Sequence, residues 1–207
     1  AIDCFRRALT VDPNRADAHN GLGAALLALG KPAEAAESFR RATQLDPNYT
    51  DAYSGLGAAM HAQRRSAEAI DAFRQAIRLN PQFAEAHRNL AMALLTSGDL
   101  REGWREYEWR LRCPDFAHLP QYPNRWNGEP LPEGTILIYA EQGLGDALQF
   151  VRYAPLVKHR CGVVCLECPS ALMRLLAKSP GIDRLIARGL PPPAMDASGT
   201  LASIAGG

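Results

Sequence analysis

The sequence predicts two parts, an all-α solenoid of antiparallel helix pairs over residues 1–113 and an incomplete α/β half-domain over residues 134–207. Three observations predict this division. Asp-Pro or Asn-Pro pairs recur at a constant interval, at positions 12–13, 46–47 and 80–81. Apolar residues between those pairs follow helical spacing, whereas continuous apolar runs typical of buried parallel strands begin at Ile136 and Val163. Five prolines without a helical period mark a linker at 114–133.

The predicted repeats comprise a half-unit, residues 1–15, and the units 16–49, 50–83 and 84–113. Small and aromatic residues recur at equivalent positions of these units. The columns are Leu22, Leu56 and Leu90; Ala35, Ala69 and Gly103; Phe39, Phe73 and Tyr107; and Ala42 and Ala76. Small residues let two helices approach closely, and the aromatic ring fills the space against the next unit. Phe5 and Ala8 occupy second-helix columns, so we expect the chain to begin in the middle of a repeat and to be a fragment.

These columns and the constant interval between the prolines resemble the tetratricopeptide repeat (TPR). The resemblance implies a concave groove, lined by the first helix of each repeat, that binds a protein or peptide partner. The Lys and Asn pairs that hold a terminal carboxylate in chaperone-binding members are missing, and only Asn89 fits the asparagine ladder of O-GlcNAc transferase arrays. The alternative is a non-catalytic scaffold whose repeats only stack on one another. The expected groove residues are Asn20, Ser54, His61, Arg88, Asn89 and Met92.

The last repeat departs from the pattern, with Arg110 in a column of small residues. Its predicted second helix runs from Gly103 to Leu111 and places Trp104, Tyr107 and Leu111 on one face. We expect this aromatic face to seal the array against the following domain. Trp126 in the linker is expected to fix the linker to a neighbouring surface.

In the second part, strands are predicted at 136–140, 163–167 and 182–186, with helices after the first strand and at 170–178. This alternation is typical of a Rossmann-like half-domain, which binds ligands at the carboxyl ends of its strands. The loop at that end of the first strand contains Gly143 and Gly145, which allow close backbone approach, and Asp146, which suits a helix cap or a general base.

The same loop is an incomplete dinucleotide-binding pattern. Leu148 stands where a third glycine is required, and Glu167 ends the second predicted strand, where an acidic residue contacts a ribose in such proteins. An NAD-type dinucleotide binder therefore remains a weaker alternative.

Four segments resemble the opening of a glycosyltransferase domain: Trp126-Asn127-Gly128, residues 136–140, the loop 141–146 and residues 149–153. The family comprises bacterial TPR proteins fused to a domain similar to the ADP-heptose:lipopolysaccharide heptosyltransferases, glycosyltransferase family 9. The resemblance implies a two-lobed (GT-B) enzyme whose N-terminal lobe handles a glycan or protein acceptor. A nucleotide sugar would bind the other lobe as donor, and Asp146 would act as general base. The substrate loop would comprise Glu141, Gln142, Gly143 and Gly145.

Glu141-Gln142 replaces the hydroxyl-rich segment of true heptosyltransferases, so the resemblance does not identify heptose as the sugar. Residues 134–207 are too few for a complete lobe. We therefore expect this chain to lack the donor-binding half, to hold no cofactor and to be inactive alone.

Composition disfavours several other functions. The 23 Lys and Arg residues against 22 Asp and Glu leave no basic excess for nucleic acid or an anionic membrane. No apolar run approaches the roughly 20 residues of a membrane span. The odd number of cysteines, five, favours a reducing compartment and hence the cytoplasm. Cys161, Cys165 and Cys168 are expected to be core residues rather than metal ligands.

Overall fold

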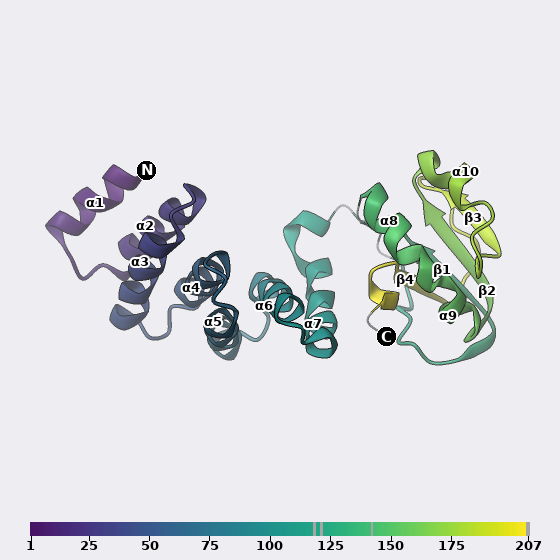
Figure 1. Cartoon of the computed structure of the whole chain (residues 1–207), viewed down its shortest axis with the longest axis horizontal. Helices are drawn as coiled ribbons and strands as arrows, with labels where there is room; N and C mark the ends of the chain where they lie inside the picture. The colour runs from purple at the N-terminus through teal and green to yellow at the C-terminus, as the bar shows by residue number, and fades with distance from the viewer. Residues whose placement is uncertain (118, 121, 142, 206–207) are drawn as a thin grey trace. The chain divides into compact units, whose positions relative to one another are not determined.

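The computed structural model describes residues 1–117, 119–120, 122–141 and 143–205 (Figure 1). The chain folds as two compact units, a helical unit of residues 1–117 and a sheet unit of residues 118–207. Among the described residues, every helix is too short or too polar to cross a membrane.

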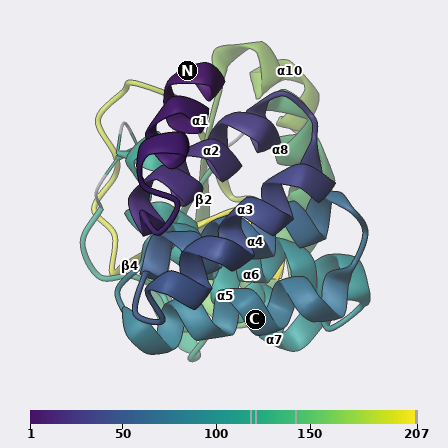
Figure 2. The ribbon, with the colours of Figure 1, turned by 90° about the vertical axis from the view of Figure 1, so that its left-hand side faces the viewer.

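The helical unit is a succession of antiparallel helix pairs with the predicted period (Figure 2). Each pair packs internally, α2 on α3, α4 on α5 and α6 on α7, and α3 and α5 also pack against the first helix of the following pair. This arrangement confirms the predicted all-α solenoid, with α1 in the position of a second helix. The helices are α1 (Ile2–Val11), α2 (Ala16–Ala28), α3 (Pro32–Leu45), α4 (Thr50–Ala62), α5 (Ser66–Leu79), α6 (Ala84–Ser97) and α7 (Leu100–Tyr107).

The aromatic column forms the contacts between repeats. Phe39, 2% exposed, lies between Gly23 of its own repeat and Gly55 of the next. A methyl group built on Gly55 would lie 2.3 Å from the Phe39 ring, and one on Gly23 would lie 2.9 Å from it. The glycines therefore provide the space that the ring fills, as the sequence columns predict.

The turn inside each helix pair requires a left-handed backbone at one position. Gly30 and Gly98 adopt φ angles of 70° and 93°, and the equivalent residue of the middle repeat, Arg64, adopts 61°. Glycine tolerates this conformation, whereas a side chain makes it unfavourable by about 1 kcal/mol. Arg64 is therefore a locally strained position.

The last helix pair corrects one prediction. The predicted α-helix to Leu111 is wrong, because α7 ends at Tyr107 and the chain continues as a 3₁₀ helix, η1 (Glu108–Arg112), followed by η2 (Pro114–Phe116). The Arg110 guanidinium donates to the Tyr107 carbonyl at 2.9 Å, the acceptor that an α-helix offers to residue 111. Cys113, before Pro114, is extended and ends the helical conformation.

The sheet unit contains a parallel sheet in the order β3-β2-β1-β4. Its core is the set of apolar side chains from β1 and β2, among them Ile136, Ile138, Val164 and Leu166, all at most 1% exposed. The strands are β1 (Leu131–Tyr139), β2 (Cys161–Cys168), β3 (Arg184–Ala187) and β4 (Ala197–Thr200). The helical segments are α8 (Leu144–Phe150), η3 (Val151–Tyr153), α9 (Ala154–Lys158), η4 (Ser170–Leu172), α10 (Met173–Leu176) and η5 (Ser203–Ala205).

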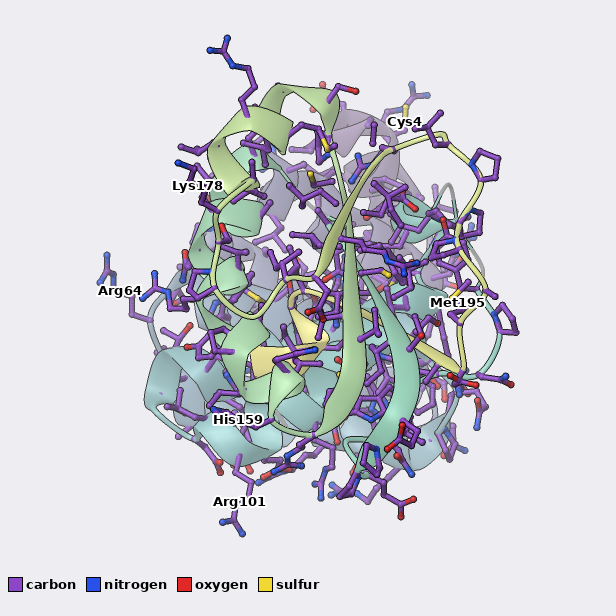
Figure 3. The ribbon with its side chains drawn as sticks, turned by 90° about the vertical axis from the view of Figure 1, so that its right-hand side faces the viewer. Cys4, Arg64, Arg101, His159, Lys178 and Met195 are labelled. Carbon is purple, nitrogen blue, oxygen red and sulfur yellow. The ribbon has the colours of Figure 1, made fainter. Side chains whose placement is uncertain are left out.

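These bounds correct several sequence-based ones. The first strand begins at Leu131, inside the predicted linker, and β4 was not predicted. The predicted helix at 170–178 is only the short segments η4 and α10. In Figure 3 the exposed side chains of His159 and Lys178 point away from the core; His159 follows α9 and Lys178 lies beyond α10.

The linker contributes to the sheet unit at the outer edge of β4. Arg125 forms a parallel bridge with Ser198, whose amide donates to the Asn124 carbonyl at 2.9 Å and whose carbonyl accepts from the Trp126 amide at 2.7 Å. The Trp126 ring packs against the core of the sheet, and its indole donates to the Glu129 carbonyl at 2.8 Å. Trp126 thus fixes this part of the linker to the sheet.

Candidate functional site

The loop between β1 and α8 lies at the carboxyl edge of the sheet. Glu141 is buried in it, 7% exposed, and Gly143 is the N-cap of α8 in an extended conformation. Asp146 is the third residue of α8 and is half-buried. Gln142, the remaining predicted loop residue, lies outside the described residues.

Both loop glycines border open space. A methyl group added to Gly143 would meet only the Asp146 carboxylate, at 3.8 Å, and one added to Gly145 would meet no described atom within 4 Å. Neither residue needs a positive φ angle. Since neither packing nor backbone conformation requires glycine here, the loop has room for another molecule to approach its backbone.

The Asp146 carboxylate has no side-chain or backbone partner in the described part of the chain. It forms no hydrogen bond or ion pair with another described residue, although it lies in the first turn of α8, where a carboxylate interacts favourably with the helix dipole. A half-exposed carboxylate without a protein partner is available to accept a proton from a bound hydroxyl group.

The strand β4 brings residues to this edge that the sequence did not predict. Tyr139 pairs with Thr200, so the loops that follow β1 and β4 leave the sheet side by side. The Thr200 hydroxyl accepts from the Ser203 amide at 3.1 Å and lies 2.6 Å from the Ser203 hydroxyl. This hydroxyl-bearing turn stands at the carboxyl end of the strand next to β1.

A polar cluster around the buried Glu167 lies along the same edge. Glu167, 3% exposed at the end of β2, accepts a hydrogen bond from the Tyr122 hydroxyl, and its other oxygen lies 4.0 Å from Arg188 Nε. Arg188 also donates to the Ala140 carbonyl, directly before the β1–α8 loop. Burial, followed by the Glu167 hydrogen bond, raises the pKa of Tyr122 to about 12. Glu167 is thus engaged by protein groups, which counts against a ribose-binding role.

The cysteines of the sheet unit are buried and reduced. Burial raises the pKa values of the Cys161, Cys165 and Cys168 thiols. A neutral thiol is a poor nucleophile and a poor metal ligand, so this environment suits core residues.

The predicted groove residues of the helical unit lie on the first helices of successive pairs. Asn20 on α2 donates to the Tyr49 hydroxyl at 3.4 Å, and Ser54 on α4 is buried. The His61 Nδ1 atom, near the end of α4, is buried without a hydrogen-bond partner among the described residues.

On α6, Arg88 forms an ion pair with Asp115 of η2 at 2.9 Å. Asn89 is half-buried, and Met92, 46% exposed, is the largest apolar side chain that this set presents to solvent. Asp115 and Tyr49 were missed by the sequence interpretation, since contacts with neighbouring turns leave no periodic signal.

Comparison with known proteins decides the nature of the helical unit. Residues 1–50 match the family model described as tetratricopeptide repeat, and residues 65–98 match a second, described as TPR repeat. The helical unit consists of tetratricopeptide repeats. Stacked repeats of this kind present extended surfaces for binding proteins, so the unit is a TPR protein-interaction module.

Three relatives illustrate the extent of this similarity. Protein FlbA of Caulobacter vibrioides is 38% identical over 68 residues, which cover 31% of this chain and 11% of FlbA. The crystal structure of MamA is 29% identical and covers 55% of this chain and 67% of MamA, with a TM-score of 0.51. A structure of Thermobaculum terrenum O-GlcNAc transferase is 23% identical and covers 89% of this chain and 36% of that protein, with a TM-score of 0.52.

Proposed function

We propose that the TPR module binds a protein or peptide partner through one face of α2, α4 and α6. This surface, the first-helix face, carries Asn20, Ser54, His61, Arg88, Asn89 and Met92. We further propose that the sheet unit is the acceptor-side part of a glycosyltransferase. The second proposal rests on Asp146, whose carboxylate has no partner among the described residues. It lies beside two glycines that border open space, at the carboxyl edge of a parallel sheet.

The strand order supports this proposal. The order β3-β2-β1-β4 is that of the first four strands of a doubly wound, Rossmann-type sheet, and it changes direction between β1 and β4. Such sheets bind ligands outside the carboxyl ends of the strands at this switch point, where the β1–α8 loop and the Thr200–Ser203 turn stand. The fold similarity to O-GlcNAc transferase spans more of the chain than the helical unit alone.

The proposed role of the carboxylate is proton removal. Asp146 accepts the proton of an acceptor hydroxyl as that oxygen attacks the anomeric carbon of a donor sugar, and the nucleoside diphosphate departs with the electrons of the broken C–O bond. Gly143 and Gly145 leave room for the acceptor against the loop backbone. We propose a nucleotide sugar as the donor, as the family resemblance implies.

A transfer assay on the complete gene product tests the enzymatic half. Asp146→Asn removes the base without changing the side-chain shape, and transfer from a nucleotide sugar should fall by about 10²–10⁴-fold. Glu133→Gln, an exposed carboxylate in the first half of β1, is the matched control and should leave transfer unchanged. Equal rates for wild type and Asp146→Asn would remove Asp146 from the mechanism.

A glycine variant separates function from folding. Gly145→Ala meets no described atom and lies in a helix, where alanine is more favourable by about 1 kcal/mol. We expect this variant to be at least as stable as wild type but slower in transfer, because the methyl group occupies the approach to the loop. A stable and fully active variant would argue against acceptor binding at this position.

The interaction half is tested by site-specific photo-crosslinking in cells. A photoreactive residue at position 89 or 92, on the first-helix face, should capture the same partner, whereas one at Glu37 on α3 should not. Capture of that partner from position 37 alone would place its binding site elsewhere.

The alternative is a non-catalytic TPR scaffold or peptide-binding protein, for which the helical unit alone is sufficient. Partner capture without any donor-dependent transfer by the complete protein would favour it.

A further inference from the structure

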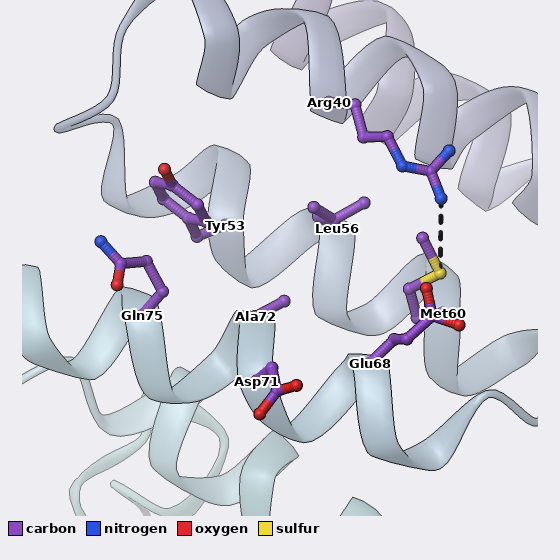
Figure 4. A pocket seen from close by; sticks show the side chains of 8 residues that line it. All are labelled: Arg40, Tyr53, Leu56, Met60, Glu68, Asp71, Ala72 and Gln75. Carbon is purple, nitrogen blue, oxygen red and sulfur yellow. Dashed lines mark hydrogen bonds between the residues drawn. The ribbon is translucent and has the colours of Figure 1, made fainter.

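A groove separate from the first-helix face lies between α3, α4 and α5 (Figure 4). Tyr53, Leu56 and Met60 of α4 contribute its base, and Asp71 and Gln75 of α5 line one side. The volume is about 290 Å³, at the lower limit of ligand-binding pockets, so the groove suits one large side chain better than a complete cofactor.

The equivalent groove one repeat later is filled by the chain itself. Trp109 stacks on His87, with ring centroids 3.9 Å apart and planes at 4°. The Arg112 guanidinium lies over the indole, 4.3 Å from the ring centroid. The indole is thus enclosed between an aromatic ring and a cation. Arg74 and Glu102, from α5 and α7, are joined beside it by an ion pair at 2.9 Å.

The groove between α3, α4 and α5 repeats this arrangement without the indole. In the sequence repeat, Tyr53 is equivalent to His87, Gln75 to Trp109 and Arg78 to Arg112. Gln75 and Arg78 belong to the α-helix α5, whereas Trp109 and Arg112 belong to the 3₁₀ helix η1. Arg78 Nε donates to Gln75 Oε1 at 2.9 Å, so the guanidinium already lies beside the position that an indole takes in the next repeat. The Tyr53 ring lines the groove, and the exposed Arg78 lies next to a lining residue, Gln75.

The ion pair that joins the neighbouring helices is also absent from this groove. Arg40 and Glu68 are the equivalents of Arg74 and Glu102, but Arg40 pairs with Glu37 at 3.3 Å, and Glu68 pairs with Arg65 at 2.6 Å. Both bonds stay within one helix or its first turn, and the Arg40 guanidinium also contacts Met60 Sδ of α4 at 4.0 Å (Figure 4).

The charge of Asp71 indicates which kind of residue should lie next to the aromatic side chain of an entering segment. Asp71 is exposed and forms no hydrogen bond or ion pair with another residue that the structure describes. The equivalent position in the filled groove is Arg105. The open groove therefore has a carboxylate where the filled groove has a cation, which favours a basic neighbour on the entering segment.

We propose that the groove between α3, α4 and α5 binds a tryptophan side chain of a partner protein, with a basic residue adjacent to it in the partner sequence. The indole stacks on Tyr53 beneath Arg78, as Trp109 stacks on His87 beneath Arg112, and the basic residue pairs with Asp71. This surface is distinct from the first-helix face.

The test uses the whole isotope-labelled chain and three probes: acetyl-Trp-Lys-amide, acetyl-Trp-amide and acetyl-Leu-Lys-amide. The Trp-Lys probe should cause saturable NMR shifts at the amides of Tyr53, Gln75 and Arg78, and the leucine probe should not. Asp71→Asn should remove the advantage of the Trp-Lys probe over acetyl-Trp-amide. Shifts of equal size with the leucine probe would overturn the proposal.

A self-filling variant provides the decisive comparison. Gln75→Trp places an indole at the sequence position equivalent to Trp109, and it should weaken binding of the Trp-Lys probe at least tenfold while shifting the protein fluorescence to shorter wavelength. Gln75→Ala is the matched control and should retain binding. If circular dichroism shows that Gln75→Trp does not fold, Tyr53→Leu replaces it and should weaken binding equally. Unchanged affinity in the folded variant contradicts the proposal.

Discussion

The packing of Phe39 gives a quantitative test of how the repeats hold together. The ring is 2% exposed and lies between Gly23 and Gly55 of successive repeats. Phe39→Ala removes that contact from both sides, so the free energy of unfolding should fall by about 3–5 kcal/mol. With a urea dependence of about 2 kcal/mol per molar, the unfolding midpoint should fall by about 2 M.

A double-mutant cycle identifies the contact responsible. A methyl group on Gly55 would lie 2.3 Å from the ring, so Gly55→Ala alone should destabilise by about 1–3 kcal/mol. In the Phe39→Ala background the same methyl group enters the vacated space and should be neutral or stabilising. The two substitutions should therefore be coupled by more than about 1 kcal/mol.

The equivalent contact in the half-repeat is the control. Gly21→Ala approaches Phe5 to 2.4 Å, but Phe5 is half-buried on α1 and its ring can move outward, so we expect a cost below about 1 kcal/mol. Unfolding in urea, followed by far-ultraviolet circular dichroism, measures all five proteins. A loss below about 1 kcal/mol for Phe39→Ala, or equal effects of Gly55→Ala in both backgrounds, would show that the Phe39–Gly55 contact does not hold the two repeats together.

Three further predictions concern single residues. Arg64→Gly relieves a left-handed backbone at φ 61° and should raise the stability of the helical unit by about 1 kcal/mol in the same urea experiment; a loss of stability would contradict the strain. Tyr122 has a folded-state pKa raised from 10.0 to about 12, so its contribution to stability is present below pH 10 and lost between about pH 10 and 12. Ultraviolet titration should show this late ionisation, and Glu167→Gln should move it to lower pH. Burial opposes ionisation of Asp183, but hydrogen bonds from Lys158 at 2.8 Å and the Val164 amide at 2.7 Å outweigh it and lower the Asp183 pKa below 3.8. The contribution of Asp183 to stability is therefore present above pH 3.8 and lost as pH falls through the folded-state pKa. Because the Asp183 side chain is 36% exposed and solvent screens the pair, Asp183→Asn should reduce stability at neutral pH by about 1 kcal/mol, and the difference from wild type should disappear in acid.

The helical unit was predictable because its pattern is repeated. Ala35, Phe39 and Ala42 recur one repeat later as Ala69, Phe73 and Ala76, and the same burial follows from the same chemistry. The β1 and β2 cores were predictable for a related reason, since continuous apolar runs such as residues 136–140 fit only strands covered on both faces.

The fourth strand was not predictable from local pattern. Ala197-Ser198-Gly199-Thr200 contains small residues with little preference for extended structure, and β4 forms because it pairs with β1 and the end of the linker. The contact of Tyr122 with Glu167 joins residues 45 positions apart and leaves no periodic signal either.

The groove between α3, α4 and α5 could be recognised only from the repeat period and the structure together. The repeat period makes Gln75 and Trp109 equivalent in sequence, but only the structure shows that Trp109 stacks on His87 and that Gln75 lines a groove. Similarly, Asp146 was singled out by its place in the loop after the first strand and by the family resemblance, and the structure adds that its carboxylate has no partner among the described residues.

The most direct test of the account is the steady-state kinetics of the Asp146→Asn variant of the complete protein, with acceptor concentration varied at saturating donor. A base that acts only on the reacting hydroxyl predicts a fall in kcat of about 10²–10⁴-fold with the KM for the acceptor nearly unchanged. An unchanged kcat, or a rise in KM alone, would contradict the role of Asp146 as the proton acceptor.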